Sequence, residues 1–364
     1  MARYAFRVDA SLEIGSGHVM RCLTLANALQ AQGVCCVFLC REHQGNLIEF
    51  LRQHGHEVLT LPLVAEEKET VEDEAVAPPS HEHWLGVDWR TDAQQTLQAL
   101  AGEPVNFLIV DHYALDARWE TAVRDICRKL MVIDDLADRS HECDLLLDQN
   151  LGRCNSDYKS LVPIGCHLLL GPTYSLLRAE FASMREYSLQ RRADPSLKKI
   201  LVTLGGVDKE NYTTRVLQAL DTAGLPLGCS VTVILGALSP YLFDVEAQAA
   251  NMKIQTQVLK GVGNMAQLMA DSDLAIGAAG STSWERCCLG LPTLLLVLAA
   301  NQENIAMELQ ENGAAELLEL DSMASSIDDF FSSKEILLRL KEMTANSSKL
   351  VDGTGTSRVI ECML

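Results

Sequence analysis

The chain has 364 residues, 48% of them hydrophobic and 22% charged, a composition that is typical of a globular protein and excludes disorder over most of its length. That length exceeds the usual size of a single hydrophobic core and predicts two domains. The 30 basic and 49 acidic residues give a net charge of −19, which argues against nucleic acid or an anionic membrane as a partner.

The 12 cysteines occur singly or as the adjacent pairs Cys35-Cys36 and Cys287-Cys288. No C-x-x-C pair is present, which argues against a zinc ribbon or a thioredoxin-type site. The start of the sequence lacks the apolar segment of a signal peptide, and no apolar run approaches the length of a membrane span. We therefore expect a cytoplasmic protein with reduced thiols.

The first half of the chain alternates short apolar strands with amphipathic helices. We predict strands at residues 4–8, 34–40, 57–61, 107–110, 130–133 and 145–147, and helices at 18–32, 47–54, 89–101 and 117–129. The acidic segment from Val64 to His83 contains Pro78-Pro79 and is interpreted as a surface loop without catalytic content.

The second half repeats the pattern after a charged segment at residues 185–196. We predict strands at residues 199–204, 231–235, 254–259, 274–276 and 293–298, helices at 211–220, 264–270 and 303–312, and a helical tail over 334–364. The fold class is therefore α/β, with two Rossmann-like, doubly wound domains facing across a ligand-binding cleft. We place these domains at residues 1–184 and 185–364.

The segment from Asp271 to Gln302 predicts a strand, a small-residue loop, a helix and a second strand. Gly280, Ser281 and Thr282 begin the helix, where hydroxyl caps and free N–H groups create a site for an anion. Glu285 follows one turn later. The alternative is a tight turn between buried elements with no ligand.

A second cluster, Asp9-Ala-Ser-Leu-Glu-Ile-Gly-Ser-Gly-His18, follows the first strand. Gly15 and Gly17 allow a close backbone approach, but the third glycine of the dinucleotide-binding motif is missing, and the Gly-Lys-Ser/Thr of a P-loop is absent. His18 lies at a helix start, where the dipole favours the neutral imidazole and a role as general base. Asp9 could orient its ring. The alternative is that His18 is only a capping or packing residue.

Polar residues also follow two later strands of the first half. Asp111-His-Tyr113 ends one strand, so its side chains can reach the same cleft, although an Asp at a strand end is often only a helix cap or loop anchor. Asp134-Asp135 follows the next strand, and a metal site is one interpretation of this pair. Neighbouring carboxylates on a strand point to opposite sides, which argues against it, and we expect no metal and no cofactor.

Five motifs in this order resemble the UDP-sugar hydrolases of pseudaminic acid biosynthesis. The motifs are Asp9-Ala-Ser-x-x-Ile-Gly-Ser-Gly-His18-x-x-Arg21, Asp111-His-Tyr113, Gly205-Gly-Val-Asp208, Gly277-Ala-Ala-Gly-Ser-Thr-Ser-Trp-Glu-Arg286 and Asn301-Gln302. The resemblance covers nearly the whole chain. It implies a glycosyltransferase-B-like fold similar to the peptidoglycan N-acetylglucosaminyltransferase.

The resemblance further implies hydrolysis of UDP-2,4-diacetamido-2,4,6-trideoxy-β-L-altropyranose, with His18 activating water for inverting attack at the anomeric carbon. It places Tyr113 and Asn301 in the sugar pocket and Glu285 on the ribose hydroxyls. The remaining expected substrate contacts are Gly15, Ser16, Gly17, Arg21, Gly205, Gly206, Asn211, Gly280, Ser281 and Thr282, and the expected catalytic residues are His18, Asp9 and Tyr113.

Two other functions remain open at this point. A glycosyltransferase would use the same UDP-sugar site but pass the sugar to an acceptor hydroxyl. A non-catalytic nucleotide-sugar sensor would need Glu285 and the glycines but not His18. The expected partner is the UDP-sugar, and association with other enzymes of the pathway is left open.

Overall fold

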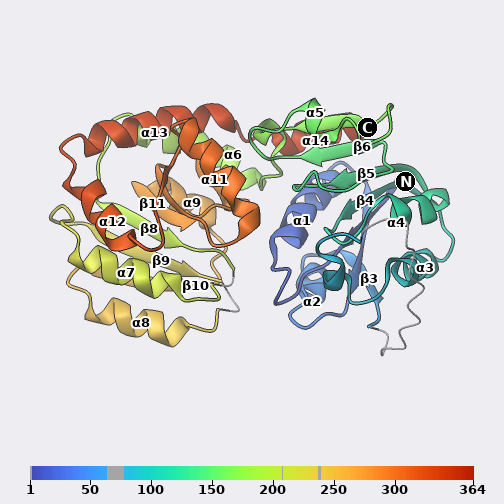
Figure 1. Cartoon of the computed structure of the whole chain (residues 1–364), viewed down its shortest axis with the longest axis horizontal. Coiled ribbons are helices and arrows are strands. Elements are labelled where there is room, and N and C mark those ends of the chain that lie inside the picture. The colour runs from blue at the N-terminus through green and yellow to red at the C-terminus, as the bar shows by residue number, and fades with distance from the viewer. Residues whose placement is uncertain (1, 64–77, 207, 237–238) are drawn as a thin grey trace. The chain divides into compact units, whose positions relative to one another are not determined.

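The computed structural model describes residues 2–63, 78–206, 208–236 and 239–364. The chain divides into two compact units, each built on one parallel β-sheet (Figure 1). The N-terminal unit comprises Met1–Leu176 and Thr356–Leu364, and the C-terminal unit comprises Leu177–Gly355. Two Rossmann-like parallel-sheet domains were the prediction from the sequence, and the fold class is confirmed.

The sheet of the N-terminal unit has seven strands in the order β3-β2-β1-β4-β5-β6-β7. Its strands are β1 Arg3–Val8, β2 Cys35–Arg41, β3 Glu57–Leu61, β4 Val105–Asp111, β5 Cys127–Ile133, β6 Leu145–Asp148 and β7 His167–Leu170. Its helices are α1 Gly17–Gln30, α2 Ile48–Gln53, α3 Trp89–Ala99, α4 Ala117–Ala122, α5 Asn155–Tyr158 and α14 Gly355–Met363, with the 3₁₀ turns η1 Glu82–Leu85, η2 Arg124–Ile126 and η3 Pro172–Tyr174.

Both faces of this sheet are buried, because alternate residues of each strand point to opposite sides. Phe6 of β1 packs in a core with residues of α1, α2 and α14, whereas the neighbouring Ala5 packs in a second core with residues of α3, α4 and α5. In a parallel sheet all carboxyl ends of the strands lie at one edge. The residues that follow β1, β4 and β5, which are adjacent strands, therefore lie at the same edge.

The sheet of the C-terminal unit has six strands in the order β10-β9-β8-β11-β12-β13. Its strands are β8 Lys199–Thr203, β9 Ser230–Leu235, β10 Gln255–Lys260, β11 Leu274–Ala278, β12 Thr293–Leu296 and β13 Glu316–Leu317. Its helices are α6 Ala179–Arg192, α7 Tyr212–Thr222, α8 Leu242–Asn251, α9 Met265–Asp271, α10 Thr282–Cys288, α11 Glu303–Glu311, α12 Met323–Ser332 and α13 Ile336–Leu350, with the 3₁₀ turn η4 Ala300–Gln302.

Several predicted elements differ from the structure. The helix predicted over residues 117–129 ends at Ala122, because Cys127–Lys129 extend β5 alongside β4. The strands β7 and β13 and the helices α5, α6, α8 and α12 were not predicted, and α6 includes most of the charged segment at residues 185–196. The predicted loop at 64–83 falls mainly on residues outside those described, but its last residues enter η1.

The division of the chain between the two units differs from the expected boundary at residues 184/185, both at that boundary and at the end of the chain. The predicted helical tail is interrupted, since α13 ends at Leu350 and α14 begins at Gly355. Val359, Ile360 and Met363 of α14 are buried in the core of the N-terminal unit, so this last helix returns to the first sheet (Figure 1). At the other boundary, α6 belongs to the C-terminal unit, where its buried Arg192 donates hydrogen bonds to Met269 and Ser272.

Candidate functional site

His18 is the second residue of α1, the helix that follows β1, and its side chain is 10% exposed. Its Nδ1 lies 2.6 Å from Oδ1 of Asp111, the last residue of β4. A carboxylate accepts hydrogen bonds but donates none, so Nδ1 carries the hydrogen and donates it. In the neutral ring Nε2 then has no hydrogen and can accept a proton.

Arg21, one turn further along α1, binds the same carboxylate. Its Nε and Nη2 donate to the two oxygens of Asp111 at 2.6 and 2.7 Å, and its Nη1 donates to Asp135 at 2.6 Å. Arg21 Nη2 and His18 Nδ1 are 3.2 Å apart, but both carry hydrogens, so this contact is not a hydrogen bond. The two salt bridges fix Asp111 and Asp135, which end adjacent strands.

These contacts determine the charge of Asp111. Burial by itself raises the pKa of this carboxyl, but the charge of Arg21, followed by that of His18, outweighs burial and holds the pKa well below its usual range. Asp111 is therefore ionised across the physiological range and keeps the proton of His18 on Nδ1.

Tyr113 completes this cluster. Its hydroxyl donates to Asp135 at 2.7 Å, and its ring meets the ring of His18 edge to face, with centroids 4.6 Å apart. Burial, followed by the charge of Asp135, raises the pKa of the Tyr113 hydroxyl well above its usual range. Tyr113 is thus a neutral donor that packs against His18, and we call His18, Arg21, Asp111, Tyr113 and Asp135 the histidine cluster.

Asp9 does not orient His18, contrary to the expectation from the sequence. Its carboxylate is fully buried and accepts hydrogen bonds from Arg7 Nη2 at 2.8 Å and from the backbone N–H of Arg41 at 2.6 Å. The Nε2 of His112 is 3.3 Å away. Asp9 therefore connects the ends of β1, β2 and β4, and Asp111 has the orienting position that was expected for Asp9.

The loop before His18 has the local geometry that its glycines predict. Gly15 has φ +80°, a conformation that favours glycine, and its N–H donates to the carbonyl of Ser11 at 2.9 Å. Ser16 precedes the first residue of α1, Gly17, but its side chain makes no capping hydrogen bond. Gly15, Ser16 and Gly17 thus immediately precede His18 in the sequence.

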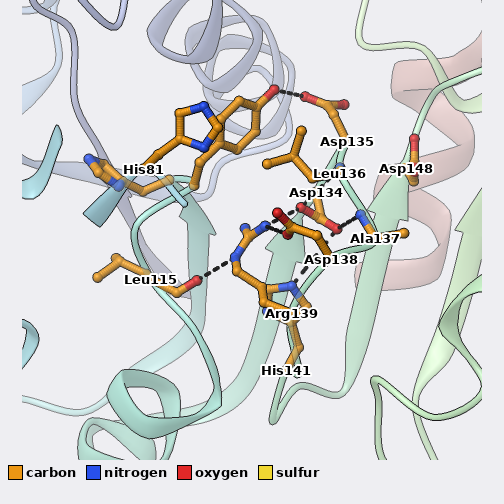
Figure 2. Close-up of polar contacts among 12 residues, drawn as sticks. His81, Leu115, Asp134, Asp135, Leu136, Ala137, Asp138, Arg139, His141 and Asp148 are labelled. Atoms are coloured by element: carbon orange, nitrogen blue, oxygen red, sulfur yellow. Dashed lines mark hydrogen bonds and ion pairs between the residues drawn. The ribbon is translucent and has the colours of Figure 1, made fainter. Parts of the chain in front are cut away.

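The neighbouring carboxylates Asp134 and Asp135 accept hydrogen bonds from two different groups of donors. Asp135 accepts hydrogen bonds from Arg21 and Tyr113. Asp134 accepts from Arg139 at 2.8 Å and from the backbone N–H of Ala137 at 2.9 Å (Figure 2). Arg139 also lowers the pKa of Asp134 well below its usual range, despite the opposing effect of burial. Within the described ranges, no three His, Cys, Asp or Glu side chains are grouped to hold a metal ion.

In the C-terminal unit, the loop from β11 to α10 surrounds the buried side chain of Arg286. Nη2 of Arg286 donates to the carbonyl of Ala278 at 2.8 Å and to the hydroxyl of Ser283 at 2.9 Å. A Cβ atom on Gly277 would lie 2.4 Å from Nη1 of Arg286, so any other residue here would force this buried side chain to shift. The predicted hydroxyl cap is not formed, because the side chain of Ser281 makes no capping hydrogen bond and Thr282 contacts Arg286 instead.

Glu285 lies on α10 with 17% of its side chain exposed. Burial raises the pKa of its carboxyl to about 7, against the opposing effect of Arg178, whose Nη2 is 3.5 Å from Oε1 of Glu285. Glu285 is therefore a carboxylate that is held weakly and titrates near neutral pH.

The loops after β8 and β9 approach each other at their glycines. Gly205 has φ +93°, and a Cβ atom on Gly236 would lie 2.0 Å from the carbonyl oxygen of Gly206. Asn211 caps α7, since its side chain accepts hydrogen bonds from the N–H and hydroxyl of Thr214. Asn301 lies in η4 and is exposed.

The structure thus brings His18, Arg21 and Tyr113 together in one unit, and the residues from Gly277 to Glu285 in the other. The sequence analysis named Asp111 and Asp135 but did not predict their partners. Asp111 is the partner of His18, and Asp135 is the partner of Arg21 and Tyr113. Their positions at the ends of adjacent parallel strands were the available signal. Chemically, the histidine cluster can remove a proton at His18 Nε2 and hold the resulting imidazolium beside an ionised carboxylate.

Comparison with known proteins relates both halves of the chain to sugar-nucleotide enzymes. Residues 200–353 match the family model of the glycosyltransferase family 28 C-terminal domain. The chain is 24% identical to an uncharacterized protein of Methanocaldococcus jannaschii, over 81% of this chain but only 55% of that protein. It is also 24% identical to the UDP-2,4-diacetamido-2,4,6-trideoxy-β-L-altropyranose hydrolase of Campylobacter jejuni, over 85% of this chain and 96% of that enzyme.

Among solved structures, MurG of Acinetobacter baumannii superimposes with a TM-score of 0.70 at 14% sequence identity, covering 100% of this chain and 99% of that one. No helix among the described residues is both long and apolar enough to cross a membrane. The chain therefore has the glycosyltransferase-B fold and is a distant homologue of a UDP-sugar hydrolase.

Proposed function

We propose that this protein hydrolyses a UDP-sugar at the anomeric carbon, with UDP-2,4-diacetamido-2,4,6-trideoxy-β-L-altropyranose as substrate. The observation that carries this proposal is the 2.6 Å hydrogen bond between His18 Nδ1 and Asp111, which leaves Nε2 as a proton acceptor. The homology to the Campylobacter hydrolase over most of both chains supports the choice of substrate.

In the proposed reaction, His18 Nε2 removes a proton from water as the water oxygen forms a bond to the anomeric carbon. The bond between that carbon and the diphosphate oxygen breaks, and UDP leaves with the electron pair. Because water attacks from the side opposite to UDP, the anomeric configuration inverts. Asp111 stabilises the imidazolium that forms, while Arg21 and Tyr113 keep Asp111 and His18 in position.

The C-terminal unit is the proposed binding site for UDP. Glu285 would accept hydrogen bonds from the ribose hydroxyls, and the backbone near Gly280, Ser281 and Thr282 would meet the diphosphate. Gly205, Gly206 and Asn211 would lie beside the nucleotide, and Asn301 would contact the sugar. Backbone N–H groups and the buried charge of Arg286 can stabilise the charge on the departing UDP, so the proposal needs no metal ion.

A glycosyltransferase is the second candidate, because residues 200–353 match a glycosyltransferase domain. In that reaction His18 would remove the proton of an acceptor hydroxyl in place of water. A nucleotide-sugar sensor is the third, and it has no use for the paired His18 and Asp111.

One experiment separates the three functions. Purified protein is incubated with the proposed substrate in H₂¹⁸O without any acceptor, and UDP release is followed. We expect UDP release, ¹⁸O in the sugar and not in UDP, and inversion at the anomeric carbon by NMR. The variant His18→Ala should lose about 10²- to 10⁴-fold in rate, whereas His54→Ala, an exposed histidine on the surface near α2, should not change the rate.

The absence of UDP release from every 2,4-diacetamido sugar would contradict hydrolysis. Release that survives His18→Ala would contradict the role of His18 as the base. UDP release that requires an acceptor alcohol would favour the transferase.

A further inference from the structure

Two further aromatic side chains lie next to the histidine cluster, and the proposed mechanism does not use them. The ring of Trp84, in η1, stacks on Tyr113 at 5.8 Å between centroids and 24° between planes. The ring of His81 lies 4.4 Å from Trp84 and 5.4 Å from Tyr113. Together with the 4.6 Å contact between Tyr113 and His18, four rings form one continuous group that ends at the proposed base.

Side-chain contacts hold this segment against the ends of two strands. Ser80 donates to Asp138, which pairs with Arg139. On the other side, Nε2 of His83 lies 2.9 Å from a carboxylate oxygen of Glu13, in the loop between β1 and α1. The segment from Ser80 to His83 is therefore held between the loop that precedes α1 and the loop that follows β5.

The rings are not part of either hydrophobic core of this unit. Leu85 is the residue that anchors η1, since it is fully buried in a core, whereas His81 and Trp84 are only partly buried. By contrast, Trp119 and Trp284 are buried to 0% and 1% exposure. Burial lowers the pKa of His81, so its ring is neutral and offers an aromatic face and no charge. His81 and Trp84 are thus both partly exposed, and each contacts the ring of Tyr113, which packs on His18.

We propose that Trp84 and His81 form a wall of the sugar site that selects for hexoses which are both 6-deoxygenated and N-acetylated. In such a sugar C6 is a methyl group, and each acetamido group carries another methyl. In the sugar of UDP-N-acetylglucosamine C6 carries a hydroxyl, and there is a single acetamido methyl. Methyl and C–H groups pack favourably on aromatic faces, and a hydroxymethyl group loses hydrogen bonds to water there. This inference rests on the proposed function, because it assumes that the sugar lies beside His18.

Binding to the inactive variant His18→Ala tests the wall without any turnover. Calorimetry would compare the proposed substrate, UDP-N-acetylglucosamine and UDP, with and without Trp84→Ala. We expect Trp84→Ala to weaken binding of the 6-deoxy substrate by about tenfold, to weaken UDP-N-acetylglucosamine less, and to leave UDP unchanged. Trp84→Phe keeps a ring and should restore most of the affinity, and Glu82→Gln, at an exposed neighbour in η1, should have no effect.

The main alternative is that Trp84 only supports Tyr113. In that case Trp84→Ala, made in the active enzyme, would lower kcat for both UDP-sugars by the same factor and leave the ratio of their KM values unchanged. That result, or equal affinity changes for both UDP-sugars in the His18→Ala protein, would overturn the inference. Failure of the proposed function has a different signature, namely that the unaltered protein releases no UDP from either sugar.

Discussion

The two units differ in the kind of polar group that they place at the carboxyl ends of their parallel strands. In the N-terminal unit these groups are charged side chains, and the carboxylates of Asp111 and Asp135 are each bound by Arg21. In the C-terminal unit they are mainly backbone atoms of small residues, next to the buried Arg286. Glu285 is a carboxylate there, and it has only a long contact to Arg178.

This difference matches two chemical tasks. Proton transfer requires a side chain with a defined hydrogen-bond partner, because the partner decides which nitrogen of a histidine is free. Binding a diphosphate requires a backbone that a bulky anion can approach, which small residues permit. The comparison predicts that substitutions in the histidine cluster will affect turnover, whereas substitutions in the loop from Gly277 to Glu285 will affect binding.

The largest effect is expected from Asp111→Asn. An asparagine can present its NH₂ group to Nδ1 of His18, which would move the ring hydrogen to Nε2 and remove the proton acceptor. We expect kcat for UDP release to fall by about 10³-fold, with UDP affinity unchanged in calorimetry. Asp144→Asn is the matched control. Asp144 directly precedes β6, so it lies at the amino ends of the strands, whereas Asp111 lies at the carboxyl ends, and Asp144 pairs with Arg124 and Lys129. A loss of less than about tenfold in Asp111→Asn would show that His18 does not depend on this partner.

A smaller effect is expected from two glycine substitutions in the C-terminal unit. The Cβ of Gly277→Ala would lie 2.4 Å from Arg286 and 3.1 Å from the carbonyl of Thr203. We expect this variant to lose about 1–3 kcal/mol in free energy of unfolding and to bind UDP more weakly. At Gly280 the new Cβ would meet only the side chain of Gln302 at 4.0 Å, so Gly280→Ala should fold normally and yet bind UDP about tenfold more weakly.

The control for both is Gly263→Ala, whose Cβ would meet no atom within 4 Å. Chemical denaturation and UDP calorimetry on the three variants separate damage to the loop from damage to the binding surface. Unchanged UDP affinity in Gly280→Ala would place the diphosphate away from this loop.

The alternation of strands and helices was sufficient to predict the fold class, and the small-residue motifs identified His18 and Glu285 as candidates. The partner of His18 was not predicted, because Asp111 is 93 residues away in the sequence while Asp9 is close. Adjacency of β1 and β4 brings both carboxylates to one edge. The hydrogen bonds that Asp9 accepts from the Arg7 side chain and from the backbone N–H of Arg41 turn it away from His18 and leave Asp111 as the partner. The apolar face of α14 likewise does not specify which of two sheets it will cover.

The smallest expected effect is a pH dependence of UDP affinity. It distinguishes the two units, because Glu285 titrates near neutral pH and Asp111 does not. Burial raises the pKa of Glu285 to about 7, whereas Asp111 is ionised at every pH near neutrality. The ionised carboxylate can accept a strong hydrogen bond from a ribose hydroxyl at each of its two oxygens, and protonation turns one oxygen into a donor, so UDP binding should weaken as pH falls through 7. With about one-tenth of Glu285 ionised at pH 6, the loss between pH 8 and pH 6 should be up to about tenfold. Glu285→Gln should lack this component, and because both proteins share the titration of the terminal phosphate of UDP, the difference between their affinity curves isolates Glu285. Curves that run parallel from pH 6 to 8 would remove Glu285 from the ribose site.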